Sequence, residues 1–358
     1  MFNFSELRQI HLEITNNCQA SCPMCNRNID SGLDNPLIKI RNWSLQEFKN
    51  VMSTEVLNQI DNFYFCGNFG DPILNNDLIE MCSYSKLASP NTAISIHTNG
   101  SARTIDWWRT LANKLPDKHR VVFALDGLKD THHIYRVGTK FETVLDNAQA
   151  FINEGGSAEW VFIKFKHNEH QVEEAESRSK RLGFQRFTVK NTIRFIGELK
   201  FAVLDKEGDT LYYLEPPTTN QVTLIDAETI KNFKKWYSET SVDCYALSKK
   251  EIYIDAHKNV FPCCFLASAP YNHSSSQSIV ADIKKQILDQ YYELVTDLGG
   301  IESLNAVDRG IKDIIDNDKW QQVWEPYWTD KKLITCARVC GVNDLSKPND
   351  QFVTRVTN

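Results

Sequence analysis

Three cysteines stand close together near the start of the chain, in the spacing C-x3-C-x2-C. Cys18, Cys22 and Cys25 directly follow residues 10–14, a short run that alternates like a β-strand. Thiols this close on one loop can converge on one metal centre, whose place the strand end fixes. A structural zinc site usually has four ligands, and no fourth Cys or His lies close enough in sequence to complete one. A cubane iron–sulfur cluster held by three cysteines leaves one iron open, and we favour it over a zinc site or a disulfide cluster.

Strands and helices alternate over the first half of the chain. Alternating or aromatic runs predict strands at residues 10–14, 62–66, 93–97, 121–125, 160–165 and 186–190. Helical periodicity predicts helices between them at residues 45–56, 76–86, 105–115, 141–153 and 169–182, and a further helix beyond them at residues 227–236. This alternation predicts parallel βαβ units and therefore an α/β fold. Polar or glycine-bearing turns follow the strands, at the edge where barrel folds gather their sites.

The cysteine spacing after the first strand resembles that of the radical S-adenosylmethionine (SAM) enzymes. The resemblance implies a partial (β/α)6 TIM-like barrel, which we place over residues 1–194. It also implies a [4Fe–4S] cluster whose open iron binds the amino and carboxylate groups of SAM. Reductive cleavage of SAM would give a 5′-deoxyadenosyl radical that removes a hydrogen atom from the substrate. The implied partner of such an oxidoreductase is a low-potential electron donor of the flavodoxin or ferredoxin type.

Turns after the second and third predicted strands resemble SAM contacts of that family. Phe69-Gly70-Asp71-Pro72 resembles the Gly-Gly-Glu-Pro-like turn that presents backbone oxygens to the SAM ammonium, with Phe for the first Gly and Asp for Glu. Thr98-Asn99-Gly100 resembles the Thr-Asn-Gly turn that faces the ribose and methionyl part of SAM. The alternative for both segments is a plain turn.

Residues after the fourth predicted strand extend the resemblance. Leu125-Asp126-Gly127, followed by His132 and Arg136, resembles the family's Ser-x-Asp-Gly…His…Arg segment, with Ala124 in place of the Ser. Arg136 matches the arginine that binds the SAM carboxylate, for which a guanidinium fork is suited. The alternative is a solvated charge at the start of a helix. Met24 stands where the family usually has an aromatic residue, and methionine can still pack against adenine.

A second group of cysteines lies in the last third of the chain. Cys244 and Cys263 flank a predicted hairpin at residues 251–261, and Cys336 and Cys340 follow an insertion at residues 265–335. Four thiolates so placed can hold one further cubane, and the alternatives are a zinc site or free buried thiols. The arrangement resembles the twitch domain, which is the one-cluster relative of the SPASM extension in radical SAM enzymes.

This second resemblance implies one auxiliary [4Fe–4S] cluster in a domain of residues 244–358, with residues 195–243 as the bridge from the barrel. The implied ligands are Cys244, Cys263, Cys336 and Cys340. The family's hairpin signature is Gly-x4-Cys, and here Lys258 replaces the Gly. That spacing makes Cys263 the ligand and leaves Cys264 as a nearby thiol.

The remaining cysteines, histidines and tryptophans predict structural roles. Cys66 and Cys82 have no partner spacing and are predicted to be buried thiols. The scattered histidines are predicted to form local hydrogen bonds and are assigned no catalytic role, and the sequence identifies no catalytic acid or base. Trp320, Trp324 and Trp328 share one face of a predicted helix, where burial is favoured over a place in a substrate groove.

Composition argues against several partner classes. The net charge of −6 gives no basic footprint for nucleic acid. No apolar run has the length of a membrane span, and the N-terminus lacks the pattern of a signal peptide. Ten cysteines, several in tight clusters, fit metal ligation in a reducing compartment, so we expect a cytoplasmic protein.

The substrate is not determined by these motifs. Twitch and SPASM relatives act on ribosomal peptides, protein side chains, sugars and cofactor precursors. We expect peptide or protein modification first and a small-molecule dehydrogenase second. Only 17 residues precede Cys18, so no fused N-terminal peptide-recognition domain is expected.

Two alternatives from other classes stay open. A SAM-independent iron–sulfur electron-transfer or sensing protein would not need Gly70-Asp71-Pro72, Thr98-Asn99 and Arg136. A zinc-structured binding module is the other alternative, and iron and sulfide analysis that finds zinc alone would favour it.

Overall fold

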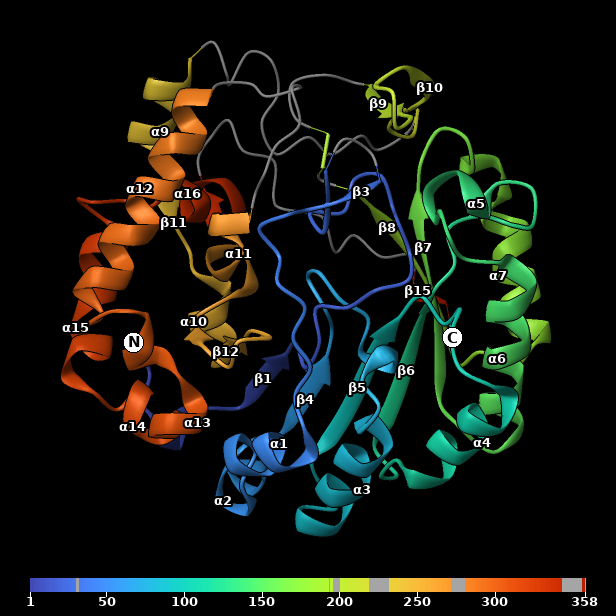
Figure 1. The fold of residues 1–358 in the computed structure, drawn as a ribbon, viewed down its shortest axis with the longest axis horizontal. Coiled ribbons are helices and arrows are strands. Elements are labelled where there is room, and N and C mark those ends of the chain that lie inside the picture. The colour runs from blue at the N-terminus through green and yellow to red at the C-terminus, as the bar shows by residue number, and fades with distance from the viewer. Residues whose placement is uncertain are drawn as a thin grey trace.

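A nine-stranded sheet lies at the centre of the molecule, in the order β13-β12-β1-β4-β5-β6-β7-β8-β15 (Figure 1). The computed structural model describes residues 1–29, 32–192, 194–195, 200–218, 232–271, 281–342 and 356–357. The strands from β12 to β8 in this order are parallel, and β13 and β15 each add an antiparallel strand at one edge. Their bounds are β1 Gln9–Leu12, β4 Asn62–Phe65, β5 Ala93–Thr98, β6 His119–Ala124, β7 Ala158–Lys164, β8 Arg186–Asn191, β12 Glu251–Ile254, β13 Val260–Phe261 and β15 Val356–Thr357.

Helices connect the parallel strands and cover one face of the sheet (Figure 1). They are α1 Leu45–Val51, α2 Thr54–Gln59, α3 Leu78–Ala88, α4 Ile105–Lys114, α5 His132–Tyr135, α6 Phe141–Asn153 and α7 Val172–Arg181. The helix-covered face is apolar, since Ile10 and Leu12 of β1 and Phe63 and Phe65 of β4 join Phe48 of α1 in one buried core. The predicted α/β fold with parallel βαβ units is therefore confirmed.

The opposite face of the sheet, which we call the inner face, carries polar and aromatic side chains. It includes His11 of β1, Tyr64 of β4, His97 of β5 and Tyr253 of β12. The His11 ring stacks on Tyr64 with 4.5 Å between centroids and meets Tyr253 edge-on at 4.7 Å. Burial lowers the pKa of His11 to about 4 and that of His97 to about 3, so both rings are neutral at neutral pH.

The connections differ in detail from the sequence expectations. The predicted helix at residues 45–56 is two helices, because the Ser53 side chain accepts a hydrogen bond from the Val56 N–H and starts α2. The hydrophobic period stays in phase across this break, so periodicity did not reveal it. The predicted helix at residues 169–182 begins with a 3-10 turn, η3 Glu169–Gln171, before α7. Gly183 follows it with φ +84°, as expected of a C-terminal glycine.

Shorter elements surround the sheet. The hairpin β9 Phe201–Leu204 and β10 Thr210–Leu214 lies in the bridging segment and was not predicted. The helix predicted at residues 227–236 falls largely outside the described residues, where the described helix is α9 Phe233–Glu239. The other elements are η1 Phe4–Glu6, β2 Asn28–Ile29, β3 Leu33–Asp34, η2 Pro72–Leu74, β11 Ser241–Val242, α10 Tyr245–Lys249, α11 Cys264–Ala267, η4 Ala269–Tyr271, α12 Ala281–Asp297, η5 Ile301–Leu304, α13 Ala306–Arg309, α14 Ile311–Ile315, α15 Asp318–Trp328, α16 Ile334–Cys340 and β14 Gly341–Val342.

The last third of the chain is continuous with the sheet. The predicted hairpin is confirmed as β12 and β13, and β12 pairs in parallel with β1. Trp320 and Trp324 are buried in the same core as the sheet residues, with Trp328 packed against it, so the burial predicted for these indoles is confirmed. In the parts of the chain that the structure describes, no helix is both long and apolar enough to cross a membrane.

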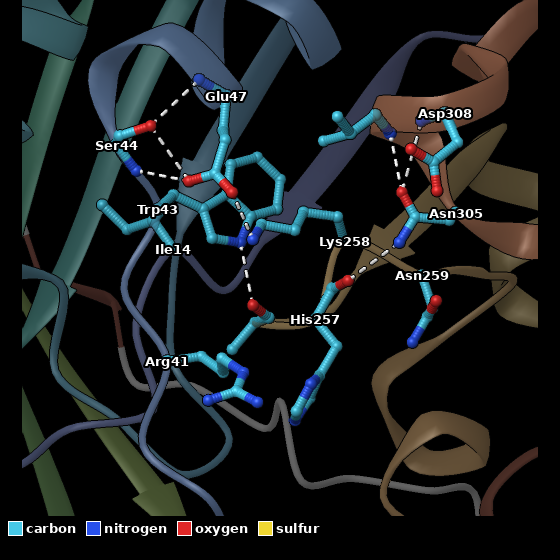
Figure 2. A network of polar contacts seen from close by, with 12 residues as sticks. Ile14, Arg41, Trp43, Ser44, Glu47, His257, Lys258, Asn259, Asn305 and Asp308 are labelled. Carbon is cyan, nitrogen blue, oxygen red and sulfur yellow. Dashed lines mark hydrogen bonds and ion pairs between the residues drawn. The ribbon is translucent and has the colours of Figure 1, made fainter. Parts of the chain in front are cut away.

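Figure 2 shows how the turn between β12 and β13 is fixed to the first helix. The Lys258 ammonium pairs with the Glu47 carboxylate at 2.5 Å, and the Trp43 indole donates to the Ala256 carbonyl oxygen at 3.2 Å. Lys258 has φ +70°, in the left-handed region that favours glycine. This position is the one at which the twitch hairpin signature has its glycine.

Candidate functional site

The C-x3-C-x2-C loop lies at the carboxyl edge of the sheet, where it meets the segments that follow β4, β5 and α5. Each thiol faces one polar atom from a different segment. Cys18 Sγ lies 3.7 Å from Asn99 Nδ2, Cys22 Sγ lies 4.0 Å from Arg136 Nη1, and Cys25 Sγ lies 3.9 Å from Asn68 O. The three predicted ligands are therefore gathered against the turns that the sequence marked as SAM contacts.

The surroundings of these thiols suit a bound iron–sulfur cluster. Burial raises the pKa of Cys18 to about 12 and that of Cys22 to about 11, so thiolates there need a cationic partner. Iron in a cubane cluster supplies that charge, and thiolates are its usual ligands. Within the described ranges, no three Cys, His, Asp or Glu side chains lie close enough together to hold a single metal ion.

The turn at residues 67–72 is held in place by Glu13, which follows β1. The Glu13 Oε1 atom accepts the backbone N–H groups of Phe69 at 2.7 Å and Gly70 at 3.1 Å. Its other oxygen accepts the hydroxyl of Tyr253 from β12. Glu13 was not predicted as a site residue, although a carboxylate within an otherwise apolar predicted strand was a signal of its role.

Two glycines allow this turn to pack closely. A Cβ atom at Gly70 would lie 2.0 Å from the carbonyl oxygen of Thr15, and one at Gly67 would lie 2.0 Å from the carbonyl oxygen of Gly70. Neither position can therefore hold a side chain without moving the backbone of the site. The plain-turn alternative does not require such close backbone approach.

Asp71 joins the turn after β4 to the turn after β5. Its buried carboxylate accepts the Thr98 hydroxyl at 2.8 Å and the Asn99 backbone N–H at 2.7 Å. The Thr98 oxygen also accepts the Gly100 N–H, and the Asn99 side-chain oxygen accepts the Gln19 amide at 2.7 Å. Both predicted SAM turns are thereby fixed to each other and to the cysteine loop.

Arg136 forms a buried ion pair with Asp126. Its Nε donates to Asp126 Oδ2 at 2.5 Å, and the two side chains are 16% and 0% exposed. The other Asp126 oxygen accepts the Ile163 N–H of β7 at 2.6 Å. The alternative of Arg136 as a solvated charge is therefore wrong. Asp126 is fully engaged by protein groups, so it positions Arg136 while the Nη1 atom faces Cys22.

Arg194 was not predicted as a site residue, yet it contacts the cysteine loop from the far side. Its Nη1 atom donates to the Met24 carbonyl oxygen at 2.7 Å and to the Tyr135 hydroxyl at 3.3 Å. Met24 is buried in a small apolar cluster with Tyr135 and Phe165. Arg194 lies beyond the motifs that carry the resemblance, so no sequence signal marked it.

The second group of thiols gathers around α10, α11 and α16. Pairing of β11 with β14 brings the start of α10 to the end of α16, and the Asp243 N–H donates to the Cys340 carbonyl oxygen at 2.9 Å. Burial raises the pKa of Cys263 to about 12, and the thiols of Cys244 and Cys340 act in the same direction. Burial also raises the pKa of Cys336 well above its usual value, with the other three thiols adding to the effect.

Cys244 and Cys263 directly precede the short helices α10 and α11, and neither thiol accepts a hydrogen bond from the helix that follows it. The nearby backbone N–H groups still lower the pKa of these thiols, and the Tyr245 N–H lowers that of Cys340, against the effect of burial. Such positive groups favour thiolates.

Cys264 is directed away from this group. Burial raises the pKa of the Cys264 thiol well above its usual value. The nearby thiols of Cys263 and of Cys66, which follows β4, raise this pKa further. Its carbonyl oxygen accepts the Asn68 side-chain amide at 3.2 Å. Because the Asn68 carbonyl lies against Cys25, one unpredicted residue contacts both cysteine regions.

The other residues behave as structural groups. Cys82 is fully buried, as predicted, and Cys66 is partly buried. The buried His132 ring pairs with the Thr139 hydroxyl at 2.8 Å, which is the local hydrogen bonding that was predicted for the histidines.

Comparison with known proteins identifies the family. Residues 12–187 match the model of the radical SAM superfamily. No curated protein sequence matches the chain. SuiB from Streptococcus suis bound to S-adenosylmethionine is similar at 15% identity and a TM-score of 0.50, over 80% of this chain and 65% of that chain. This chain therefore spans slightly less than two thirds of that SuiB chain.

Two further solved structures have the same fold. SuiB bound to its precursor peptide SuiA is similar at 13% identity and a TM-score of 0.54, over 89% of this chain and 67% of that chain. The protein anSMEcpe with bound AdoMet is similar at 16% identity and a TM-score of 0.52, over 93% of this chain and 84% of that chain. Through residues 12–187, the chain belongs to the radical SAM superfamily, whose cofactors are a [4Fe–4S] cluster and SAM.

Proposed function

We propose that this chain is an oxidoreductase or maturase that cleaves SAM reductively and removes a hydrogen atom from a peptide or protein side chain. The bound cluster supplies the electron for SAM cleavage, and the low-potential donor is of the flavodoxin or ferredoxin type. The observation that carries the proposal is the convergence of Cys18, Cys22 and Cys25 on the segments after β4, β5 and α5. A cytoplasmic location accords with the ten free cysteines.

The protein groups around the cluster site have separate roles in this proposal. The turn formed by Phe69, Gly70 and Asp71 binds the SAM ammonium, and Arg136 binds its carboxylate through the guanidinium edge left free by Asp126. Thr98 and Asn99 face the ribose and methionyl part, and Met24 packs against adenine. Holding SAM in one orientation confines the radical to the substrate and excludes other hydrogen donors.

We further propose an auxiliary [4Fe–4S] cluster in a twitch-like domain of residues 244–358, joined to the barrel through residues 195–243. Its ligands would be Cys244, Cys263, Cys336 and Cys340. The influence of the four thiols on one another's pKa supports this proposal, because it requires that they lie close together, as does the left-handed backbone at Lys258. Bound there, such a cluster would take up the electron left on a product radical or anchor the substrate.

A peptide substrate is proposed from the similar structures. Among the similar structures, SuiB is bound to the precursor peptide SuiA and anSMEcpe to the Cp18Cys peptide. At 13% and 16% identity these likenesses show the fold alone, so the substrate class needs its own test. If candidate precursor peptides fail to bind the purified protein, a small-molecule dehydrogenase becomes the better assignment.

The central test is anaerobic formation of 5′-deoxyadenosine. The reconstituted protein is mixed with SAM and dithionite, and the product is measured by mass spectrometry. We expect product in the wild type and in the control Cys82→Ala, and none in Cys22→Ala. An intact cluster spectrum with no SAM binding by calorimetry would instead favour the SAM-independent electron carrier.

Adjacent cysteines allow a matched test of the auxiliary cluster. We expect Cys263→Ala to lose about four of about eight iron atoms per chain, because a cubane needs that thiolate. Cys264→Ala is expected to keep the full iron content, because the pKa of its thiol is influenced by Cys263 and Cys66 but not by Cys244, Cys336 or Cys340. Equal iron content in the two variants would contradict the ligand assignment.

A further inference from the structure

Lys190 is a half-buried cation on the inner face of the sheet. It lies on β8, beside Ile163 of β7 in the sheet register. Phe187 and Val189 of the same strand belong to the helix-covered core. Since successive strand residues point to opposite faces, Thr188 and Lys190 both point to the inner face.

The Lys190 ammonium reaches groups on distant strands. Burial lowers the pKa of His97 on β5 to about 3, and Lys190 adds to that shift. Burial raises the pKa of Cys66 after β4 to about 12, and Lys190 opposes that shift. It also opposes the raised pKa of Asp126, though less than Arg136 does. A side chain of β8 can influence β4 and β5 only because the sheet curls, so Lys190 lies inside the curl near the carboxyl edge.

Lys190 has no acceptor for its charge in the part of the chain that the structure describes. Among the described residues, none lies within hydrogen-bond or ion-pair distance of its Nζ atom. By contrast, Arg136 is paired with Asp126, and Arg194 donates to the Met24 carbonyl.

The hydroxyl of Thr188 lacks a partner as well. Thr188 lies two residues before Lys190 on the same face and is 3% exposed, yet its Oγ1 atom is buried without a hydrogen bond among the described residues. Buried polar groups are nearly always satisfied, so an unpaired buried hydroxyl beside a half-buried ammonium indicates a ligand.

We propose that Lys190 and Thr188 bind a carboxylate of the substrate, such as an acidic side chain or the chain end of a peptide. The inference rests on the proposed function and names the chemistry of its substrate. One ammonium and one hydroxyl match a single negative charge, whereas a phosphate dianion is usually met by several cationic groups. Bound near Asp126 and Arg136, the carboxylate would fix the substrate beside the predicted SAM site.

The test measures binding of propionate and of inorganic phosphate to the reconstituted full chain with SAM bound, by calorimetry at constant ionic strength. Lys190→Met is compared with Lys206→Met, a change of an exposed lysine in the turn between β9 and β10. We expect propionate to bind about tenfold more weakly to Lys190→Met and unchanged to Lys206→Met, because one charge-assisted hydrogen bond is lost. The melting temperature of Lys190→Met is expected to be no lower than that of the wild type, since the substitution breaks no hydrogen bond or ion pair among the described residues.

Several results would overturn the assignment. Unchanged propionate binding in Lys190→Met would remove Lys190 from the site, and preferential phosphate binding would replace the carboxylate by a phosphate. Loss of SAM binding in that variant would assign Lys190 to SAM, and a lower melting temperature would make it structural. Failure of the proposed function can be told apart from failure of the carboxylate site. If only the proposed function fails, the wild type binds propionate but forms no 5′-deoxyadenosine.

Discussion

At the scale of single residues, Glu13 links three parts of the site. One carboxylate receives two backbone N–H groups of the turn at residues 67–72 and the hydroxyl of Tyr253. Burial raises the pKa of Glu13 to about 7, and these hydrogen bonds reduce the shift without abolishing it. The carboxyl therefore titrates in the neutral range.

The raised pKa of Glu13 predicts a pH dependence of stability. Because the folded pKa exceeds the unfolded value of about 4.5, the stabilisation is fully present below pH 4.5 and is lost as pH rises through 7. Between pH 5 and pH 8 the free energy of unfolding of the wild type should fall by roughly 2–3 kcal/mol relative to that of Glu13→Gln, whose side chain cannot ionise. Urea unfolding at both pH values measures this, with the exposed Glu173→Gln as the control. If the free energy of unfolding of the wild type and that of Glu13→Gln changed equally with pH, the raised pKa of Glu13 would be contradicted.

The buried ion pair of Asp126 and Arg136 predicts a large effect of one substitution. Asp126→Asn leaves the Arg136 charge buried without its partner, which typically costs about 3–5 kcal/mol. The control is Asp289→Asn, which breaks the exposed pair with Lys285 and should have no measurable effect. Chemical unfolding of both variants gives the comparison, and equal free energies of unfolding would exclude a structural role for the buried pair.

Which site residues the sequence could reveal depended on whether a motif contains them. The three cysteines and the turns at Asp71 and Thr98 follow family motifs, so they were predicted. Glu13, Asn68 and Arg194 act through backbone groups of other segments, and such contacts have no sequence spacing of their own. Arg136 was predicted as a ligand, but its partner Asp126 could be identified as a positioning residue only from the geometry.

At the scale of elements, the turn between β12 and β13 contains a non-glycine residue in a backbone conformation that such residues disfavour. Lys258 adopts φ +70° and pairs with Glu47 of α1. A non-glycine residue in the left-handed region costs about 1–2 kcal/mol, which the ion pair offsets in part. The element that carries Cys263 is thus fixed by a contact with the first helix.

Paired substitutions at Lys258 can separate backbone strain from the ion pair. Both Lys258→Gly and Lys258→Ala remove the pair with Glu47, but only glycine relieves the strain. We expect Lys258→Gly to be more stable than Lys258→Ala by about 1 kcal/mol in chemical unfolding. At Lys285, which lies inside α12, we expect the glycine variant to be less stable than the alanine variant, because glycine weakens a helix. Greater stability of Lys258→Ala would refute the strained turn.

The elements themselves were predicted where hydrophobic period and flanking turns agree. The parallel strands and α6 or α7 meet that condition. The break between α1 and α2 was missed because Ser53 caps a new helix without changing the period. Pairing of β12 with β1 joins residues about 240 positions apart, and no local pattern carries that information.

At the scale of the whole molecule, the second cysteine group and the turn at residues 67–72 are joined through one sheet. β12 hydrogen-bonds to β1, Tyr253 to Glu13, and Asn68 to the carbonyl of Cys264. The Phe69 ring also contacts Tyr271 edge-on with 5.3 Å between centroids. The last third of the chain therefore shapes the turn that is proposed to bind SAM.

This continuity predicts that the first part of the chain does not fold alone. A fragment of residues 1–243 would leave β1 as an open edge, expose the core face of β1 and α1, and deprive Glu13 of its Tyr253 partner. We expect it to aggregate in size-exclusion chromatography and to lack a cooperative thermal transition by circular dichroism. The matched control is the full chain carrying Cys244→Ala and Cys340→Ala, which removes proposed cluster ligands but keeps the strand pairing. That variant should stay monodisperse, since β12 and the core are intact, and a cooperatively folded fragment would show that the two parts are independent.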